Sequence, residues 1–248
     1  MTIARLCIKI VEWIKEKVKE AGARGGVFGL SGGVDSAVVG GLCKQALGND
    51  VLALIMPCYN DPFDIQCARD VAKKFKINTR LIPLEPVYDK FKEILPSGNK
   101  LAQANLKPRL RMITLYYFAN NLNYIVIGTG NKSELAVGYF TKYGDGGVDI
   151  LPLGGILKTE VREIARYIGV PGYIIKKPPS AGLWNGQTDE EEMGITYEEL
   201  DEIILHLEEG QKTSLAKENI TRVKSMMEKA WHKKIPPPFF EKSKCSQN

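Results

Sequence analysis

The sequence predicts an α/β fold in which helices flank a doubly wound, mostly parallel sheet and a helical segment forms the C-terminal part. Short apolar runs alternate with amphipathic stretches through the first half of the chain, which is typical of strands joined by helices. The run 51–56 is apolar at every position, as expected of a strand that helices cover on both faces. The alternation fades after Leu151, and two helical patterns close the chain.

The elements are expected in the following order. Apolar residues recur at helical spacing between Ile3 and Val18, which predicts an amphipathic opening helix. Strands are expected at 27–30, 51–56, 79–82 and 124–127. Helices fill the gaps, and the clearest are expected at 37–47, from about Lys158, at 197–208 and at 214–231.

Composition limits the size and the surroundings of the protein. With 248 residues, of which 44% are hydrophobic, the chain can bury one sizeable core, so we expect a single domain over 1–248. The net charge of +5 suits an anionic ligand, but no basic tract with interleaved aromatic residues indicates a nucleic acid partner. No apolar run approaches the roughly 20 residues that a membrane span needs. The five cysteines show no paired or metal-binding spacing, which predicts a reduced, cytoplasmic protein.

Residues 29–36, Gly-Leu-Ser-Gly-Gly-Val-Asp-Ser, are the most informative segment, because they join an apolar run to a helical one. Gly32 and Gly33 allow a sharp turn that aims backbone N–H groups at one point. Ser31 and Ser36 add hydroxyl donors, and the following helix directs its positive end to the same point. The segment therefore predicts a phosphate-binding loop. Its residues are Gly29, Leu30, Ser31, Gly32, Gly33, Val34, Asp35 and Ser36.

Asp35 narrows the chemistry of this loop. A carboxylate beside phosphates repels them unless a cation lies between, so Mg²⁺ is implied. The lysine-containing Gly-x-x-x-x-Gly-Lys-[Ser/Thr] spacing is absent, which argues against transfer of a γ-phosphoryl group.

Two later segments remain open to more than one interpretation. The basic cluster Lys229, His232, Lys233 and Lys234 is either a solvated helix end or a phosphate contact. The segment 182–194 contains glycines and an acidic run, and is predicted to be a mobile loop that closes over bound nucleotide, with an ordinary linker as the alternative.

Three further motifs give the chain a family resemblance. They are Asn-Leu-Lys-Pro-Arg-Leu-Arg-Met at 105–112, Gly-Thr-Gly-Asn-Lys-Ser-Glu at 128–134 and Gly-Tyr-Phe-Thr-Lys-Tyr-Gly-Asp-Gly-Gly-Val-Asp at 138–149. Together with the loop, they resemble the ammonia-dependent NAD synthetases, which are N-type ATP pyrophosphatases with an adenine nucleotide alpha hydrolase-like fold. The resemblance runs from about residue 29 to residue 234. It implies that ATP adenylates the carboxylate of nicotinic acid adenine dinucleotide and that ammonia then displaces AMP to give NAD.

The resemblance also implies roles for individual residues. It extends the ATP site to Thr129, Lys158 and Ser180. It makes Asp35 and Glu134 the Mg²⁺ ligands and adds Lys158 as the third catalytic residue. Residues implied to bind the dinucleotide are Arg109, Lys142, Asp149, His232 and Lys233.

A homodimer is expected as well. In the resembling family both subunits line the dinucleotide site, and the helical stretch 112–118 carries more apolar and aromatic side chains than one buried helix face needs. Packing of these side chains within the monomer is the alternative.

Other functions stay open from the residues alone. A different enzyme on the same loop, such as an amidotransferase synthetase domain or a tRNA-modifying enzyme, and a nucleotide-binding module without catalysis are the alternatives. Arg109 and Arg111 could face solvent, Glu134 could merely complement a helix N-terminus, and Lys142 could pair with Asp149 at the surface.

Overall fold

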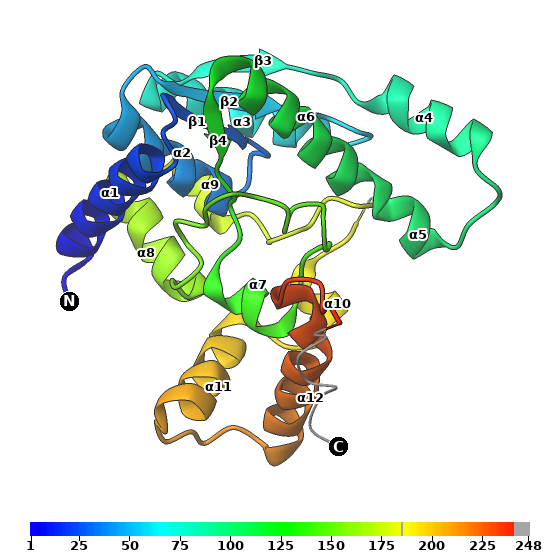
Figure 1. Cartoon of the computed structure of the whole chain (residues 1–248). Coiled ribbons are helices and arrows are strands. Elements are labelled where there is room, and N and C mark those ends of the chain that lie inside the picture. The colour runs from blue at the N-terminus through cyan, green and yellow to red at the C-terminus, as the bar shows by residue number, and fades with distance from the viewer. Residues whose placement is uncertain (185, 241–248) are drawn as a thin grey trace.

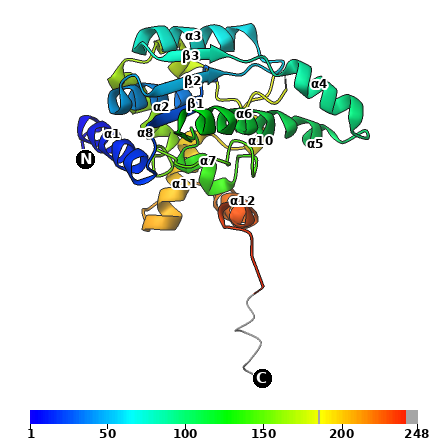
Figure 2. The ribbon, with the colours of Figure 1, turned by 45° about the horizontal axis from the view of Figure 1, so that its top comes forward.

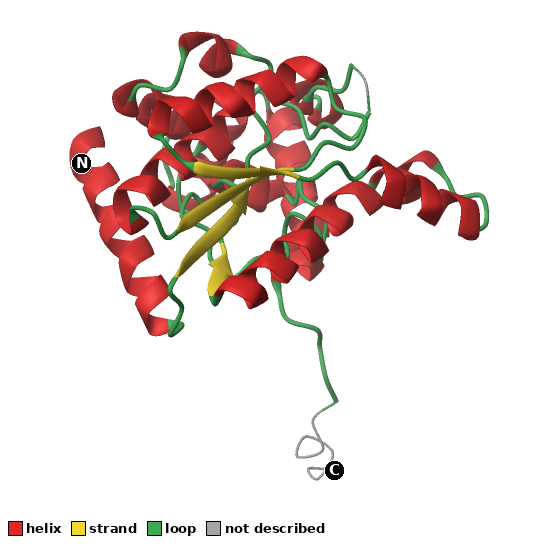
Figure 3. Ribbon diagram, turned by 90° about the horizontal axis from the view of Figure 1, so that it is seen from above, coloured by secondary structure: helices red, strands yellow, loops and turns green. Residues whose placement is uncertain are grey.

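A four-stranded parallel sheet lies at the centre of the structure, with helices on both faces (Figures 1 and 3). The structure is a computed structural model and describes residues 1–184 and 186–240. The strands are β1 (Gly25–Gly29), β2 (Val51–Ile55), β3 (Asn78–Leu81) and β4 (Tyr124–Val126). Their order across the sheet is β3-β2-β1-β4, and every pair is parallel. The predicted α/β class is confirmed.

The helices surround this sheet and continue beyond it. In chain order they are α1 (Ile3–Glu20), α2 (Val34–Leu47), α3 (Pro62–Phe75), α4 (Glu85–Ile94), α5 (Lys100–Ala104), α6 (Leu106–Leu122), α7 (Lys132–Val137), α8 (Lys158–Ile168), α9 (Gly172–Lys176), α10 (Asp189–Met193), α11 (Tyr197–Glu209) and α12 (Lys217–Lys234). Figure 2 shows α11 and α12 on the opposite side of the molecule from α3.

Several predicted boundaries shift for identifiable reasons. The first strand begins at Gly25 rather than at Val27, and a side chain at Gly25 would lie only 2.0 Å from the Asp50 carbonyl oxygen. The helix that follows the loop 29–36 begins at Val34 rather than at Ala37. Asp35 therefore lies in its first turn. The segment 182–194 is not entirely a loop, because the Thr188 side chain caps the short helix α10 by accepting a bond from Glu191 N–H.

The core consists of three apolar clusters. On one face of the sheet, Ile14 of α1, Leu42 of α2 and Ile164 of α8 are fully buried against Phe28. On the other face, β1 and β2 pack against apolar residues of α4 and α6. A third cluster, centred on Tyr197 and Leu200, joins α7, α11 and α12.

The order of the strands determines where a ligand can bind. From β1 the chain proceeds to β2 on one side, whereas β4 pairs with β1 on the other side. The connections that leave β1 and β4 therefore separate at the carboxyl end of the sheet and leave a crevice. Both the loop 29–36 and the segment that follows β4 begin there. Within the described residues, no helix combines the length and the apolar character needed to cross a membrane.

A matched pair on α1 tests the assignment of the core. Ile14 is fully buried and Ile8 is exposed on the same helix. We expect Ile14→Ala to lower the free energy of unfolding by about 2–5 kcal/mol, because truncation removes buried area and leaves a cavity. Ile8→Ala should change it by less than about 0.5 kcal/mol. Urea unfolding measures both, and equal effects would contradict the packing of α1 on the sheet.

Candidate functional site

A cavity of about 1170 Å³ opens at the carboxyl ends of the strands. The ends of β1 and β2 and the segment after β4 form its floor, and α6, the segments 177–184 and 186–189 and the end of α12 form its walls. Pockets for a single small ligand measure about 300–1,000 Å³, and this cavity lies just above that range.

The loop 29–36 is fixed by its own side chains. Ser36 is buried, and its hydroxyl donates to the Gly33 carbonyl oxygen at 3.0 Å and accepts from Ser31 N–H at 3.2 Å. Ser31 Oγ accepts from Gly33 N–H at 3.2 Å. The predicted role of Ser36 as a ligand donor is therefore less direct than expected, since its hydroxyl braces the turn.

Gly32 anchors the same loop to α3. It adopts φ +82°, and a Cβ there would lie 2.2 Å from the Asp64 carbonyl oxygen, so no larger residue fits. Its own carbonyl oxygen accepts a bond from Lys177 Nζ at 3.1 Å, and the same ammonium lies 2.5 Å from Asp64 Oδ1. Unlike the other residues predicted for this loop, Gly32 does not line the cavity.

Lys177 is a residue whose role the sequence did not reveal. Its contacts with Gly32 and Asp64 connect the loop to the segment that contains Ser180, which does line the cavity. In the sequence, the two lysines and two prolines before Ser180 mark this segment as unusual. They do not predict which residues Lys177 contacts.

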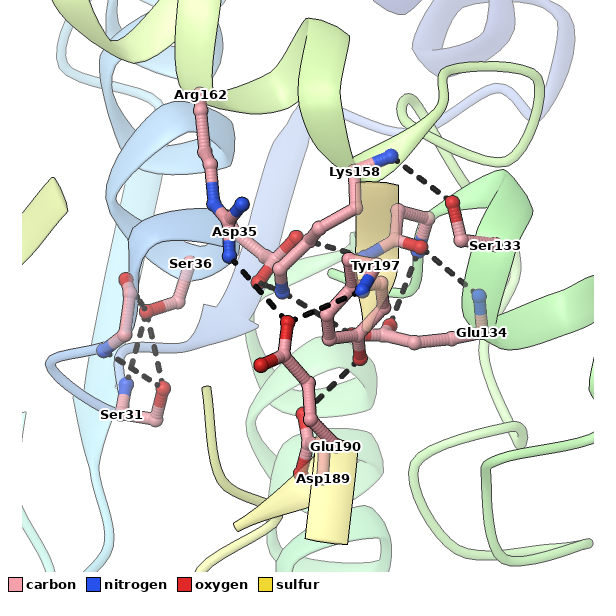
Figure 4. A network of polar contacts seen from close by, with 12 residues as sticks. Ser31, Asp35, Ser36, Ser133, Glu134, Lys158, Arg162, Asp189, Glu190 and Tyr197 are labelled. Carbon is pink, nitrogen blue, oxygen red and sulfur yellow. Dashed lines mark hydrogen bonds and ion pairs between the residues drawn. The ribbon is translucent and has the colours of Figure 1, made fainter. Parts of the chain in front are cut away.

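A buried ion cluster lies beside the loop (Figure 4). Lys158, at the first position of α8, is 1% exposed. Its Nζ lies 2.5 Å from Asp35 Oδ2 and 3.4 Å from Glu134 Oε1. Asn131 Nδ2 donates to Asp35 Oδ1 at 2.9 Å. The three residues predicted to be catalytic thus converge from α2, α7 and α8.

The charges in this cluster perturb one another. Burial raises the pKa of Glu134 to about 8, and Lys158 counteracts that rise. Burial alone would lower the pKa of Lys158, but Asp35 and Glu134 outweigh it and hold the pKa above its usual value. When Glu134 is ionised, two carboxylates face one ammonium, and a further cation bound beside them would favour that ionised form.

Glu134 complements the start of α7 and also faces the ion cluster. Its backbone N–H donates to Asn131 Oδ1 at 2.9 Å, and its Oε2 accepts from Asn131 N–H at 3.2 Å, which forms a capping box at the start of α7. Its other oxygen, Oε1, is the one nearest Lys158. The helix cap therefore orients the carboxylate toward the cluster.

Asp201 on α11 bonds to the starts of α7 and α8, the two helices that carry Glu134 and Lys158. It is buried, accepts a bond from the Ser133 hydroxyl at the start of α7, and accepts from Thr159 N–H at 2.9 Å. Ser133 Oγ in turn accepts from Lys158 N–H at 2.9 Å. Asp201 thus holds the N-termini of α7 and α8 together, where a negative charge is also favoured by both helix dipoles. The sequence analysis did not single out Asp201. Its position on the otherwise apolar face of α11 could have indicated a buried, bonded carboxylate.

The opposite wall of the cavity carries the residues predicted for the dinucleotide. The lining includes Arg109, Lys142, His232 and Lys233, and also Thr129 of the predicted ATP site. Lys142 Nζ donates to the His232 carbonyl oxygen at 2.6 Å, and Lys233 Nζ donates to the carbonyl oxygens of Gly138 and Phe140 at 2.7 and 2.9 Å. The end of α12 is therefore attached to the segment 138–142, rather than being a freely solvated helix end.

Asp149 lies apart from the other residues predicted to bind the dinucleotide. It does not line the cavity, and its carboxylate accepts bonds from Val126 N–H at 2.7 Å and from the Tyr116 hydroxyl at 2.9 Å. Within the described residues it forms no ion pair with Lys142, the alternative considered from the sequence.

Two cations of α6 brace the cavity near β2, and of these Arg111 lines it while Lys107 lies behind the lining. Arg111, which could have faced solvent, instead donates from Nε to the Met56 carbonyl oxygen at 3.1 Å and from Nη2 to Asn60 Oδ1 at 2.8 Å. Lys107 is buried and donates to the Leu183 carbonyl oxygen at 2.9 Å. Burial lowers the pKa of both groups. They fix the segment after β2 and the segment 182–184 on the cavity.

Comparisons with known proteins agree on one family. The family model described as NAD synthase matches residues 6–237. The NH₃-dependent NAD⁺ synthetase of Archaeoglobus fulgidus is 51% identical over 241 residues, which cover 96% of this chain and 97% of that protein. A solved NH₃-dependent NAD synthetase from Campylobacter jejuni has a TM-score of 0.85 at 31% identity and covers 97% of this chain and 100% of that one. An NMN synthetase from Francisella tularensis has a TM-score of 0.87 at 38% identity, with 96% and 100% covered.

Two glycines with positive φ test the loop. Gly32 and Gly48 have φ of +82° and +61°, but a Cβ at Gly48 would have no atom within 4 Å. We expect Gly48→Ala to cost about 1–3 kcal/mol of unfolding free energy through backbone strain alone, since Gly48 has ψ −115°, and to retain ATP binding. Gly32→Ala should displace the loop from α3 and weaken ATP binding at least about tenfold. Calorimetric titration measures the affinities, and equal ATP affinity in the two variants would contradict the anchoring role of Gly32.

Proposed function

The chain belongs to the NAD synthase family, and we propose that it catalyses the ATP-dependent amidation of nicotinic acid adenine dinucleotide by ammonia, the last step of NAD biosynthesis. The observation that carries this proposal is the Lys158 ion cluster beside a phosphate-binding loop, in one cavity with a second basic wall. ATP would bind at the loop and the dinucleotide at the wall that contains Arg109, Lys142 and Lys233.

The amidation needs ATP for a chemical reason. Ammonia that attacks a free carboxylate would have to expel oxide, whereas attack on an acyl-adenylate expels AMP. Forming the adenylate places negative charge on the α-phosphate and on the departing pyrophosphate. Lys158 and the N–H groups of the loop and of the α2 N-terminus are arranged to stabilise that charge.

The donor set also fits Mg²⁺. The ion takes one or two protein carboxylates and completes its shell with phosphate oxygens and water. Within the described residues no group of three or more His, Cys, Asp and Glu could hold a metal, but Asp35 and Glu134 already converge on one cationic group. These two carboxylates would hold Mg²⁺, which when bound neutralises phosphate charge.

Thiol chemistry of the kind used by tRNA-modifying enzymes is disfavoured. The cysteines in the described part of the chain, Cys7, Cys43, Cys58 and Cys67, are free and buried. Burial raises the pKa of all four thiols, which lowers their reactivity. Free, buried thiols also support a reducing compartment, and we place the protein in the cytoplasm.

A direct assay tests the function. The protein is mixed with ATP, MgCl₂, NH₄Cl and nicotinic acid adenine dinucleotide, and NAD, AMP and pyrophosphate are expected in equal amounts. ADP as the product would contradict the proposal. Because one structural relative is an NMN synthetase, nicotinic acid mononucleotide is the second acceptor to compare, and a preference for it would reassign the acceptor. Glutamine freed of ammonium should not replace NH₄Cl.

A homodimer would account for Asp149. The residue lies outside its own cavity, beside Tyr116 of α6. On the same helix Ile113 and Tyr117 are 57% and 66% exposed, one turn apart, so they form an apolar face. If two copies pair through this face, Asp149 of each copy would reach the dinucleotide site of its partner.

A mixing experiment tests the shared site. Asp149→Asn and Lys158→Ala should each inactivate the dimer, but one of the two sites in a mixed dimer would be intact. Refolding the two variants together should therefore restore about a quarter of the wild-type activity, as expected for random pairing in a twofold dimer. Tyr117→Glu should yield an inactive, folded monomer in sedimentation, and Tyr167→Glu, an exposed tyrosine on α8, should remain an active dimer. A fully active monomer would exclude the dimer.

A double-mutant cycle tests whether Asp35 and Glu134 act together through Mg²⁺. Asp35→Asn and Glu134→Gln keep the shapes of the side chains and should each slow pyrophosphate release by about a hundredfold. The double variant should lose less than the product of the two effects, because residues that share an ion are not additive. Glu163→Gln, an exposed carboxylate on α8, is the control. Multiplicative losses that are insensitive to the Mg²⁺ concentration would refute the shared ion.

A further inference from the structure

One carboxylate in the cavity lacks the partner that its burial requires. Asp189 is 3% exposed and lines the cavity. Its Oδ2 accepts a bond from the Tyr197 hydroxyl at 3.0 Å. Its Oδ1 is the one buried side-chain nitrogen or oxygen atom without a hydrogen-bond partner in the described part of the chain. A buried, half-bonded carboxylate costs free energy, so its retention calls for a ligand.

The other carboxylates on the cavity wall already have partners. Asp64 pairs with Lys177, and Asp145 accepts a bond from Thr141 N–H at 2.9 Å. Glu192 accepts from the Tyr139 hydroxyl and from Gln187 Nε2, both at 2.7 Å. Asp189 therefore stands apart from its neighbours.

The surroundings of Asp189 indicate a cation (Figure 4). Asp35, Glu134 and Asp189 lie around a single ammonium, that of Lys158, which is committed to Asp35 and Glu134 and lies 4.8 Å from the centroid of the Tyr197 ring. The Tyr197 oxygen lies 3.0 Å from Asp189 Oδ2 and 3.4 Å from Glu134 Oε1, but it has only one proton to donate. The group thus has more lone pairs than protons, and with its carboxylates ionised it carries more negative than positive charge, a state that a bound cation favours.

We propose that Asp189, with the Tyr197 hydroxyl, forms the binding site for the ammonium ion, which gives one proton to the Asp189 carboxylate and so becomes the ammonia that supplies the nitrogen. Ammonium donates four hydrogen bonds and accepts none, so it matches a carboxylate oxygen and a hydroxyl oxygen that both have free lone pairs. A water molecule would satisfy Oδ1 but would leave the negative charge uncompensated. The site adjoins the ion cluster, where the activated carboxylate would form. This inference rests on the proposed function, because it assigns a place to one substrate of that reaction.

The kinetic test separates ammonium from the other substrates. In Asp189→Asn we expect the KM for ammonium to rise about tenfold or more, since a charge-assisted hydrogen bond is replaced by a neutral one. The KM values for ATP and the dinucleotide should stay within about twofold of wild type, because Asp189 is not assigned to either. Glu191→Gln, an exposed carboxylate of the same helix α10, is the matched control and should leave all three unchanged.

Hydroxylamine supplies a second readout. It is uncharged at neutral pH and does not need a carboxylate to hold it, so Asp189→Asn should form the hydroxamate at the wild-type rate. A structural defect would instead slow both nucleophiles. An unchanged KM for ammonium in Asp189→Asn would overturn the ammonium site.

If Asp189→Asn is inactive, its melting temperature still tests the ammonium site. Removing an uncompensated buried charge should leave the melting temperature of Asp189→Asn equal to or above that of wild type. NH₄Cl should raise the melting temperature of wild type more than KCl does, and this difference should vanish in the variant. If Asp189→Asn fails to fold, Tyr197→Phe replaces it and should also raise the KM for ammonium. An equal response of both proteins to NH₄Cl, or an unchanged KM in Tyr197→Phe, would contradict the site.

Different results would refute the proposed function and the ammonium site. Wild-type protein that releases no pyrophosphate from ATP and the dinucleotide would refute the proposed function itself. Pyrophosphate release together with an ammonium KM that is independent of Asp189 would refute only the ammonium site.

Discussion

The buried ammonium of Lys158 is the constraint on which the site depends. At 1% exposure it needs partners, and they come from Asp35 on α2 and Glu134 on α7. An unpaired buried charge costs several kcal/mol, so α2, α7 and α8 are held in one relative position by this single requirement. The phosphate-binding loop, which leads directly into α2, is thereby placed beside the same charges. The packing of α2, α7 and α8 that completes the fold therefore also assembles the candidate site.

The cavity has two halves of different construction. The half near β1 relies on a braced turn and on helix N-termini, which attract phosphates through backbone groups. The other half relies on long cationic side chains from α6, the segment 138–142 and the end of α12. The strand order places both halves at one edge of the sheet, because the chain leaves β1 and β4 in different directions. Two nucleotides can thus meet at a single reacting centre.

Periodicity and motifs predicted much of this structure, and long-range contacts account for the rest. The apolar run 51–56 and the loop 29–36 are local signals, so the central strand and the turn from β1 into α2 were predictable. The roles of Lys177 and Asp201 were not, because each depends on partners more than 40 positions away. Asp149 was predicted from a motif, yet its side chain is bonded to Val126 and Tyr116 outside the cavity. A motif identifies residues that act together, but not the partners that each side chain finds in the fold.

The buried Asp201 has a consequence for attempts to alter this protein. Because one carboxylate holds the starts of both α7 and α8, Glu134 and Lys158 cannot be repositioned separately. The phosphate half is therefore a poor target for redesign. The end of α12 is attached to the segment 138–142 by lysine-to-carbonyl bonds, which tolerate changes in the side chains around them. Selection for new acceptor molecules should accumulate substitutions on that wall and leave the phosphate half unchanged.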